Sequence, residues 1–287
     1  MIIIHSIKHL QELTEIVRKK DKTIGFVPTM GALHQGHLSL VKTSMQQCDY
    51  TIVSIFVNPT QFENSSDFKN YPRTQEADTA LLYEVGVDFV FIPSEKEIYP
   101  TPGIRTFRFG KIGAIMEGAY RPGHFNGVAQ VVSRLFDIVQ PDMAFFGEKD
   151  YQQLVIIKQL VKQMDLPVEI ESCPIVRESD GLAMSSRNRL LTTEQRAHAP
   201  LIARTLFEAG DKIKKMSINT LKEWVAQTID ADPYLKTEYV EVVNAVTLHP
   251  LKRPTEADIM QLCVAVYADP IRLIDNIRLD KICKSKY

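Results

Sequence analysis

The alternation of apolar strands and amphipathic helices through residues 1–176 constrains the fold of this 287-residue chain more than any other feature. A helical face carrying Leu10 and Val17 precedes the apolar run "TIGFVP", which ends at a proline and is typical of a buried strand. Further strands are expected at 50–57, 87–93, 142–147 and 167–176, and further helices at 37–48, 74–85, 124–139 and 150–164. This order predicts an α/β fold, a Rossmann-like, doubly wound, mostly parallel sheet that binds ligands beyond the carboxyl ends of its strands.

The last third of the chain follows a different pattern. Helical periodicity covers roughly 192–230 and precedes three strand-like runs, "EYVEVVNA", "IMQLCVAVYA" and "IRLIDNI", with no helical pattern between them. We therefore predict a second, smaller α+β domain, with residues 1–175 in the first domain and residues 176–287 in the second.

Charge and cysteine content narrow the class of protein. The 34 Lys and Arg residues balance 35 Asp and Glu residues without a long block of one sign, which favours small-molecule partners over nucleic acid or a membrane surface. The cysteines lack the C-x-x-C spacing of zinc or redox sites, so we interpret them as reduced thiols; they are Cys48, Cys173, Cys263 and Cys283. No run approaches the roughly 18 apolar residues of a membrane-spanning helix, and a cytoplasmic location is expected.

The segment "GALHQGHL" (31–38) packs two glycines and two histidines directly after the strand expected at 23–28. Its glycine spacing resembles a phosphate-binding P-loop, but His37 and Leu38 stand where that loop needs Lys and Ser or Thr, so we reject this interpretation. His34 and His37 are spaced as a metal-binding pair, yet no third ligand of suitable spacing lies nearby. Two solvent-facing loop histidines remain as the purely structural alternative.

A strand-to-helix turn that binds an anion fits these surroundings better. Free backbone N–H groups and the helix dipole at such a turn favour negative charge, and Gly31 and Gly36 allow the backbone to approach a phosphate closely. The imidazoles of His34 and His37 are then expected to donate hydrogen bonds to phosphate oxygens whose charge grows as pyrophosphate leaves.

These residues also carry a resemblance to a known family. "HQGH" resembles the H-x-G-H element of the nucleotidylyltransferase superfamily, which is related to the class I aminoacyl-tRNA synthetases. More narrowly, the chain resembles the pantothenate synthetase (pantoate–β-alanine ligase) family along nearly its whole length. The strings that match, in family order and spacing, are "VPTMGALHQGHLSLV", "IFVNPTQF", "DFKNYPRT", "EGAYRPGHFNGV", "FGEKDYQQL", "MSSRN" and "RLIDNI".

The resemblance implies an enzyme that joins pantoate to β-alanine through a pantoyl adenylate, converting ATP into AMP and pyrophosphate. Mg²⁺ is expected to accompany ATP, but no string identifies a protein ligand for it, and Asp78 is only a candidate. The family is typically a homodimer. Two alternatives stay open: a nucleotidylyltransferase that keeps the nucleotide on its product, and a non-catalytic ATP-binding module on the same fold.

The resemblance further assigns roles to individual residues. The expected catalytic residues are His37, His34 and Lys149. The expected ATP contacts are Met30, Gly31, His34, Gly36, His37, Gly147, Lys149, Asp150, Val176, Met184, Ser185, Ser186 and Arg187. The expected pantoate contacts are Gln61 and Gln153, with Gln61 also at β-alanine, and Asn58 and Arg121 are further candidates.

Residue chemistry leaves some of these roles open. Asp150 suits the ribose hydroxyls of ATP, or it caps the helix that follows. Gln152 is the neighbouring alternative to Gln153, because either amide offers a donor and an acceptor to a substrate with a carboxylate and hydroxyls. The string "SSR" alone fits an exposed polar turn equally well. Leu190 stands where the family pattern has a tyrosine, which affects the packing of that subsite but not the phosphate donors.

Overall fold

The computed structural model describes residues 1–62, 65–100 and 105–280, and the chain forms two compact units. Met1–Glu148 and Ile156–Pro174 make up the first unit, and Lys149–Val155 joins the chain from Ile175 onward in the second unit. The segment Lys149–Val155, which the predicted boundary places in the first domain, thus belongs with the C-terminal unit.

A parallel sheet of strand order β1-β4-β3-β2-β5-β6 forms the centre of the first unit. Its strands are β1 (Ile2–Ile4), β2 (Ile24–Thr29), β3 (Tyr50–Ile55), β4 (Phe89–Phe91), β5 (Met143–Gly147) and β6 (Glu169–Cys173). The helices are α1 (Ile7–Arg18), α2 (Gln35–Gln47), α3 (Ser65–Asn70), α4 (Gln75–Val85), α5 (Glu95–Ile98), α6 (Glu117–Tyr120), α7 (His124–Val139) and α8 (Tyr151–Met164), which begins in the segment of the second unit. Short 3₁₀ turns occur at η1 (Pro59–Gln61), η2 (Gly110–Gly113) and η3 (Glu148–Asp150).

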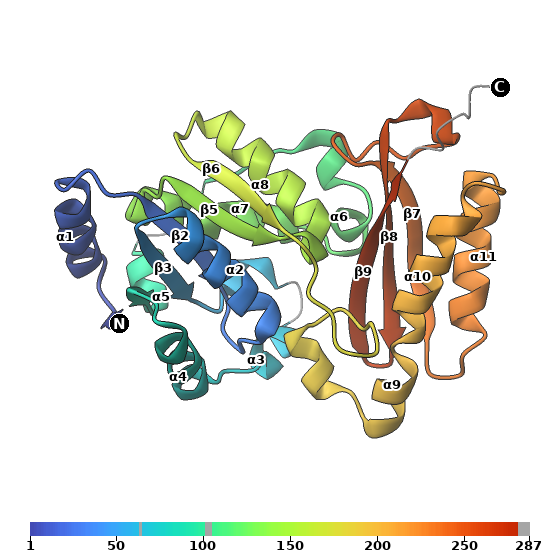
Figure 1. Ribbon diagram of the computed structural model, residues 1–287, viewed down its shortest axis with the longest axis horizontal. Helices are drawn as coiled ribbons and strands as arrows, with labels where there is room; N and C mark the ends of the chain where they lie inside the picture. Colours follow the sequence, from blue (N-terminus) through green and yellow to red (C-terminus); the bar gives the residue numbers. More distant parts are fainter. Residues whose placement is uncertain (63–64, 101–104, 281–287) are drawn as a thin grey trace. The chain divides into compact units, whose positions relative to one another are not determined.

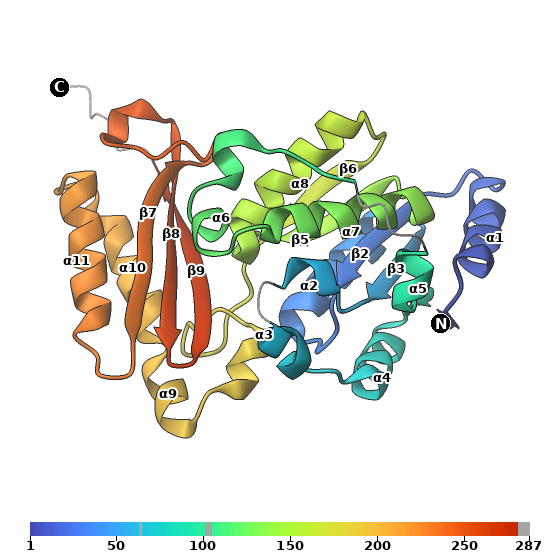
Figure 2. The ribbon, with the colours of Figure 1, turned by 180° about the vertical axis from the view of Figure 1, so that it is seen from behind.

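Helices cover both faces of this sheet. Two adjacent residues of β2 show this, because successive side chains of a strand point to opposite faces. Phe26 packs edge-on against Phe136 of α7, with ring centroids 6.4 Å apart. Val27 belongs instead to a buried cluster with Leu38 and Val41 of α2. Figure 1 shows α2 in front of the sheet, and Figure 2 shows α7 on the opposite side. The predicted doubly wound α/β fold is confirmed.

The strand order reverses at β2. The chain passes from β2 to its neighbour β3 on one side and later fills the position on the other side with β5. In open α/β sheets, ligands bind outside the carboxyl ends of the strands where the order reverses in this way. The carboxyl end of β2, where the glycine- and histidine-rich segment begins, is therefore the place in this unit best suited to a ligand.

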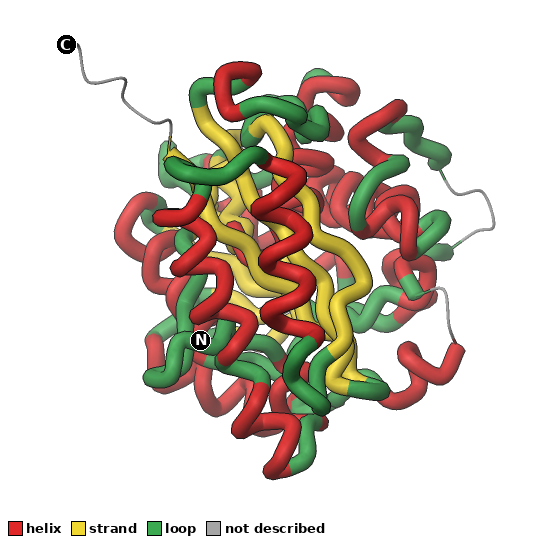
Figure 3. The backbone as a smooth tube through the Cα atoms, turned by 90° about the vertical axis from the view of Figure 1, so that its right-hand side faces the viewer, coloured by secondary structure: helices red, strands yellow, loops and turns green. Residues whose placement is uncertain are grey.

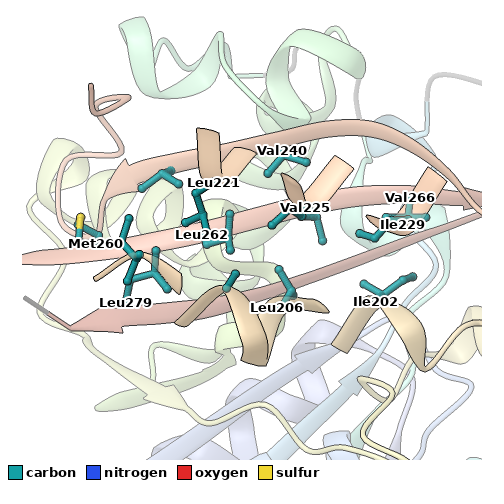
Figure 4. Close-up of a cluster of buried hydrophobic side chains, with 14 of the residues drawn as sticks. Ile202, Leu206, Leu221, Val225, Ile229, Val240, Met260, Leu262, Val266 and Leu279 are labelled. Atoms are coloured by element: carbon teal, nitrogen blue, oxygen red, sulfur yellow. The ribbon is translucent and has the colours of Figure 1, made fainter. Parts of the chain in front are cut away.

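The second unit is built on an antiparallel sheet of β7 (Lys236–Asn244), β8 (Ile259–Ala268) and β9 (Ile271–Asp280). Its helices are α9 (Thr193–His198), α10 (Leu201–Lys212) and α11 (Ile218–Asp230), with 3₁₀ turns at η4 (Ser186–Leu190) and η5 (Pro254–Glu256). Figure 3 shows helices crossing in front of the strands of this sheet, and Figure 4 shows Leu206 of α10, Val225 of α11 and Leu262 of β8 meeting in the core between them. The predicted α+β character of the C-terminal region is confirmed.

The short elements are what the sequence patterns did not predict. β1 is a three-residue edge strand whose Ile2 pairs with Phe89 of β4, and it is too short to carry a hydrophobic period. The helices α3, α5 and α6 were likewise not expected. Across the described part of the chain, every helix is too short or too polar to cross a bilayer.

Candidate active site

The turn after β2 has an unusual backbone. Gly31 and Ala32 both have positive φ angles, 81° and 50°. A Cβ atom built on Gly31 lies only 3.0 Å from Oδ2 of Asp78 and 3.1 Å from Cγ2 of Ile55. Glycine is therefore required here both by the backbone conformation and by the close approach of the Asp78 carboxylate. The structure gives Gly31 this role in the turn, which the sequence analysis did not foresee.

The side chain of Asp78, on α4, holds the backbone of the turn that follows β2. Its side chain is 1% exposed, Oδ2 accepts a hydrogen bond from the Ala32 N–H at 2.9 Å, and Oδ1 accepts one from the Leu33 N–H at 2.8 Å. The Thr74 hydroxyl donates to Oδ1 as well, at 3.2 Å. Both carboxylate oxygens are thus engaged with the protein, which makes Asp78 a poor fit as a magnesium ligand and a good anchor for the turn.

The two histidines cap the first turn of α2 reciprocally. His34 is the N-cap, and its Nδ1 accepts a hydrogen bond from the Gly36 N–H at 3.1 Å. Nδ1 of His37 accepts a longer one, 3.4 Å, from the His34 N–H, and the two rings lie 4.1 Å apart between centroids. A neutral imidazole whose Nδ1 is an acceptor carries its proton on Nε2. Each ring is therefore a donor at Nε2, the atom farther from the backbone.

These contacts correct the expectation of free backbone N–H groups at this turn. The N–H groups of Ala32 and Leu33 are bonded to Asp78, and that of Gly36 is bonded to the His34 ring. The features of the turn that suit an anion are therefore the Nε2–H groups of the histidines and the positive end of the α2 dipole.

Gly147 ends β5, the strand next to β2 in the sheet, and so lies at the same carboxyl edge as the turn. A Cβ atom built on Gly147 meets no atom within 4 Å. The space beside this backbone is open, and the contact of Gly147 with ATP stays a prediction.

Gln61 belongs to a buried polar network with Asn58. The Asn58 amide is 1% exposed and donates to Oε1 of Gln61 at 3.1 Å, while Oδ1 of Asn58 accepts a hydrogen bond from the Tyr99 hydroxyl at 2.8 Å. Burial raises the pKa of Tyr99, so this hydroxyl stays protonated as a donor. With its oxygen bound to Asn58, Gln61 directs its Nε2–H₂ group toward Sδ of Met30, 2.9 Å away. The network fixes which end of the Gln61 amide is a donor.

Arg121 joins the same region through His124. Nδ1 of His124 is 2.9 Å from the Gln61 carbonyl oxygen, and Nε2 of His124 is 3.3 Å from a guanidinium nitrogen of Arg121. Gly127 of α7 allows η1 to lie this close, because a Cβ at that position would collide with the Thr60 carbonyl oxygen. The first unit thus brings Met30, Asn58, Gln61 and Arg121 into one connected group.

The segment that carries Lys149 is anchored within the second unit. The Lys149 carbonyl accepts a hydrogen bond from the Asn276 amide at 2.9 Å, and the Tyr151 hydroxyl donates to the Ala245 carbonyl at 2.8 Å. Gln152 is 4% exposed, whereas Gln153 is half-buried. The segment is short, and its fixed points come from β9 and from the end of β7.

Residues 176–187 of this unit contain a second set of the residues expected from the sequence to contact ATP. The Met184 N–H donates to the Val176 carbonyl at 3.0 Å, which closes the turn between them. Ser185 is the N-cap of η4, and its hydroxyl accepts a hydrogen bond from the Arg187 N–H at 3.2 Å. Ser186 is buried, while Leu190, the departure from the family pattern, is 45% exposed. A leucine at this exposed position leaves the capped turn intact.

The structure therefore gathers the expected site residues into two groups, one in each unit. The first group is Met30, Gly31, His34, Gly36, His37, Asn58, Gln61, Arg121 and Gly147, and the second is Lys149, Asp150, Gln153, Val176, Met184, Ser185, Ser186 and Arg187. Sequence reasoning missed the anchoring residues, among them Tyr99, His124 and Asn276. His124 and Asn276 lie inside the family-like strings "EGAYRPGHFNGV" and "RLIDNI", whereas no sequence signal marks Tyr99.

The described residues contain no cluster of metal ligands, and the thiols of Cys48 and Cys173 are less acidic than an ordinary cysteine. Among residues 1–62, 65–100 and 105–280, no three His, Cys, Asp or Glu side chains are grouped as metal ligands. Burial raises the pKa of Cys48 to about 11, and burial also raises the pKa of Cys173. Cys48, Cys173 and Cys263 are buried, and Cys283 lies outside the described residues.

Comparison with known proteins places these features in a family. The model of the pantoate-beta-alanine ligase family matches residues 2–278. The pantothenate synthetase of Bacteroides thetaiotaomicron is 48% identical over 282 residues, covering 98% of this chain and 100% of that protein. The crystal structure of pantothenate synthetase from Thermus thermophilus superimposes with a TM-score of 0.90 at 39% identity, covering 98% of this chain and 100% of that one.

A third relative is a pantoate-beta-alanine ligase from Francisella tularensis, solved as a complex with beta-gamma ATP and beta-alanine. It has a TM-score of 0.76 at 37% identity and covers 96% of this chain and 97% of its own. The full-length family match, the relative of near-equal length and the shared fold agree: the chain belongs to the pantoate–β-alanine ligase family, enzymes that form an amide bond.

Proposed function

We propose that the chain condenses pantoate with β-alanine to give pantothenate, using ATP and passing through a pantoyl adenylate. In the first step a pantoate carboxylate oxygen bonds to the α-phosphorus, and the bond from that phosphorus to pyrophosphate breaks. In the second step the β-alanine amine bonds to the pantoyl carbonyl carbon and AMP leaves, with loss of a proton from the amine. The reciprocal histidine cap at the start of α2 carries this proposal.

The capped histidines suit the first step, because negative charge develops on the departing pyrophosphate. Two imidazoles with acceptor Nδ1 atoms offer two Nε2–H donors held in place before the reaction begins. Donors fixed in this way stabilise developing charge without reorganising, which is a large source of rate acceleration. We assign His34 and His37 to this role.

Pantoate and β-alanine recognition falls to the glutamine network. Gln61 has its oxygen bound to Asn58 and one amide hydrogen directed at Sδ of Met30, so its second amide hydrogen is the group assigned to a carboxylate or hydroxyl of the substrate. A carboxylate nucleophile is already ionised near neutral pH, so this site needs orientation more than a base. Gln153 is assigned to pantoate as well, and Asn58 and Arg121 support the Gln61 group.

The remaining ATP contacts are assigned to the second unit and to the edge of the first. Lys149 and Arg187 supply positive charge to the phosphates, with the Ser185 and Ser186 hydroxyls as further donors. Met30, Gly31, Gly36, Gly147 and Met184 line the nucleotide with their backbone or side chains, Asp150 suits the ribose, and Val176 lies at adenine. The Francisella tularensis relative was solved with beta-gamma ATP and beta-alanine, which supports ATP and β-alanine as substrates in this proposal.

Mg²⁺ enters this proposal as part of the ATP substrate. The engaged carboxylate of Asp78 does not suit it as a ligand, so phosphate oxygens and water are expected to coordinate the ion. A homodimer in the cytoplasm is the expected form of the enzyme, and light scattering at micromolar concentration tests the dimer.

Pyrophosphate exchange tests the adenylate directly. With pantoate, ATP and Mg²⁺ present and β-alanine omitted, labelled pyrophosphate should appear in ATP. Exchange that strictly requires β-alanine contradicts a free-standing adenylate. Product analysis with all substrates should show free AMP and pyrophosphate, whereas a nucleotide attached to the product indicates a nucleotidylyltransferase, and no pyrophosphate release indicates a binding module.

A further inference from the structure

Two adjacent polar residues are buried in β9, and the proposed chemistry uses neither of them. Asp275 and Asn276 are 4% and 3% exposed. Successive side chains of a strand point to opposite faces, so Asp275 shares a face with the core residues Leu273 and Leu279, and Asn276 lies on the other face. Burying polar groups is unfavourable unless they form hydrogen bonds, so their partners indicate what these residues hold.

Asn276 holds the backbone of Lys149. Its amide nitrogen donates to the Lys149 carbonyl at 2.9 Å, and its amide oxygen accepts a hydrogen bond from Nε2 of Gln261 at 2.6 Å. Gln261 of β8 is itself 4% exposed. Because Gln261 donates to the oxygen, the nitrogen of Asn276 must be the end that faces Lys149. The hydrogen bond from Gln261 thus orients the Asn276 amide so that its nitrogen can donate to the Lys149 carbonyl.

The hydrogen bond to the Lys149 carbonyl matters because the backbone around Lys149 has little regular structure of its own. Lys149 lies in η3, a single 3₁₀ turn of three residues, where hydrogen-bond geometry is weak. A lysine side chain is a point charge on a flexible four-carbon stem, so the place from which the stem starts is what the fold can fix. The bond from Asn276 fixes that starting point within the second unit.

Asp275 makes the matching contact on the opposite face of β9. Its carboxylate binds the Arg177 guanidinium through two bonds, of 2.7 and 3.0 Å. Arg177 also donates to the Gly181 carbonyl at 3.0 Å, which closes the turn between Val176 and Met184. Two neighbouring residues of one strand thus anchor both of the ATP-type segments of this unit.

We infer that Asn276 is a positioning residue for the reaction: it holds the Lys149 backbone so that the ammonium group meets the phosphates of ATP. This inference rests on the proposed role of Lys149. It predicts that Asn276 acts on adenylate formation through Lys149 and not through the stability of the fold.

A double-mutant cycle on the full-length protein tests this. The variant Asn276→Asp keeps an acceptor for Gln261 and removes the donor to Lys149. It should slow single-turnover adenylate formation at saturating ATP and pantoate about 10-fold, since small misplacements of a charged group cost up to about 100-fold. In a Lys149→Ala background the same substitution should change the rate less than about 2-fold, because residues that act as a unit are not additive.

Tyr151→Phe is the matched control. It removes a different side-chain anchor of the same segment, the hydroxyl bond to Ala245, and leaves the bond to Lys149 in place. Its melting temperature should fall about as far as that of Asn276→Asp, with a near-normal rate. If Asn276→Asp does not fold, Gln261→Met removes the donor that orients the Asn276 amide and should show the same dependence on Lys149.

The outcomes separate the two proposals. A near-normal rate for Lys149→Ala overturns the role of the lysine, and this inference with it. A slow Lys149→Ala protein in which Asn276→Asp causes the same fold-loss as in wild type overturns the inference alone. Equal rate losses for Tyr151→Phe and Asn276→Asp also overturn it, since they indicate general anchoring of the segment.

Discussion

In the first unit, the residues proposed to stabilise the departing pyrophosphate lie on one contiguous segment, 30–37, and cap one another. In the second unit, the residues proposed to contact the phosphates lie on separate segments, around Lys149 and at 184–187. Within 184–187, the Ser185 hydroxyl caps η4 by accepting a hydrogen bond from the Arg187 N–H. The Lys149 backbone and the Arg177 side chain, which begins the turn leading to residue 184, are bonded to buried polar residues of β9, a strand more than eighty residues further along the chain.

The two groups of residues differ in how local the contacts are that hold them. A helix cap replaced by alanine typically costs about 0.5–2 kcal/mol, and the damage stays within one turn. A buried network loses more, because the partner left behind is unsatisfied. We therefore expect substitutions in the histidine turn to change the rate with little loss of stability, and substitutions around β9 to affect both.

The largest expected effect is that of His37→Ala. Loss of one preorganised donor to a developing anion typically slows the chemical step by about 10² to 10³. Ground-state ATP binding should change far less, because the donor is needed most as pyrophosphate leaves. Single-turnover adenylate formation at saturating ATP measures the rate, and ATP titration measures the binding. His34→Ala should behave similarly.

A thermal melt separates this effect from damage to the cap. His37→Gln is the useful companion, since a glutamine at this position of the helix can still accept from the N-cap N–H group. It should keep the melting temperature near that of wild type and still lose rate. His198→Ala, which removes a histidine paired with Asp232 in the second unit, should leave the rate unchanged. A near-normal rate for His37→Ala contradicts the proposed mechanism.

Asp78→Asn is expected to rank second. The Ala32 and Leu33 N–H groups donate to different oxygens of Asp78, so an asparagine would set its own NH₂ donor against one of them, and the turn should shift. We expect a loss of about 1–3 kcal/mol in the free energy of unfolding. The rate of adenylate formation should fall about 10-fold or more, because the histidines follow the turn.

Asp88→Ala is the control for stability. Asp88 accepts a hydrogen bond from the Thr51 N–H at 2.8 Å. Thr51 lies where β3 begins, at the amino ends of the parallel strands, whereas the histidine turn lies at their carboxyl ends. Its loss should lower the free energy of unfolding to a similar degree and leave the rate intact once the protein is folded. If the two variants lose rate equally, Asp78 does not position the histidines.

Much of this fold follows from the sequence, because its long elements are strongly periodic. The apolar faces of α1 and α7 and the β-branched runs of β3 and β8 identify those elements without tertiary information. The three-residue strand β1 and the four-residue helix α5 are too short to carry such a period. β1 depends on pairing with the distant strand β4, and α5 is a single turn capped by Ser94.

The site follows the same division. The histidine segment is contiguous, so its glycines and imidazoles suggest a ligand site when read in order. The contacts that hold the site span long sequence separations, as between Asp78 and Leu33 or Asn276 and Lys149. No local pattern distinguishes a buried anchor from a surface residue, so Asp78 looked like a metal candidate and Asn276 had no assigned role.

Gln153→Ala tests the proposed pantoate contact in the second unit, at the start of α8. We expect it to raise the KM for pantoate by a factor that corresponds to about 1–3 kcal/mol, the cost of a lost hydrogen bond to a polar substrate, with ATP binding nearly unchanged. Gln152→Ala is the matched variant one residue away, and because Gln152 is 4% exposed it should lower the melting temperature more. A fall in ATP affinity with normal pantoate affinity contradicts the assignment of Gln153.

The smallest expected effect is at the outer end of the turn that Arg177 closes. Asp180 accepts from Arg196 at 2.6 Å and from the Leu182 N–H at 3.2 Å, and the Arg196 hydrogen bond is the main cause of its lowered pKa. Its side chain is 38% exposed, so solvent screens the pair and Asp180→Asn should cost less than about 1 kcal/mol. Because the folded pKa lies below the unfolded one, this stabilisation is complete above about pH 4 and is lost as pH falls through the folded pKa.

Melts of wild type and Asp180→Asn at pH 7 and pH 3, in low and high salt, should show a difference in stability that shrinks with acid and with salt. A loss of several kcal/mol that persists in high salt contradicts this and makes the exposed ion pair, as well as the buried Asp275 contact, an anchor of the turn.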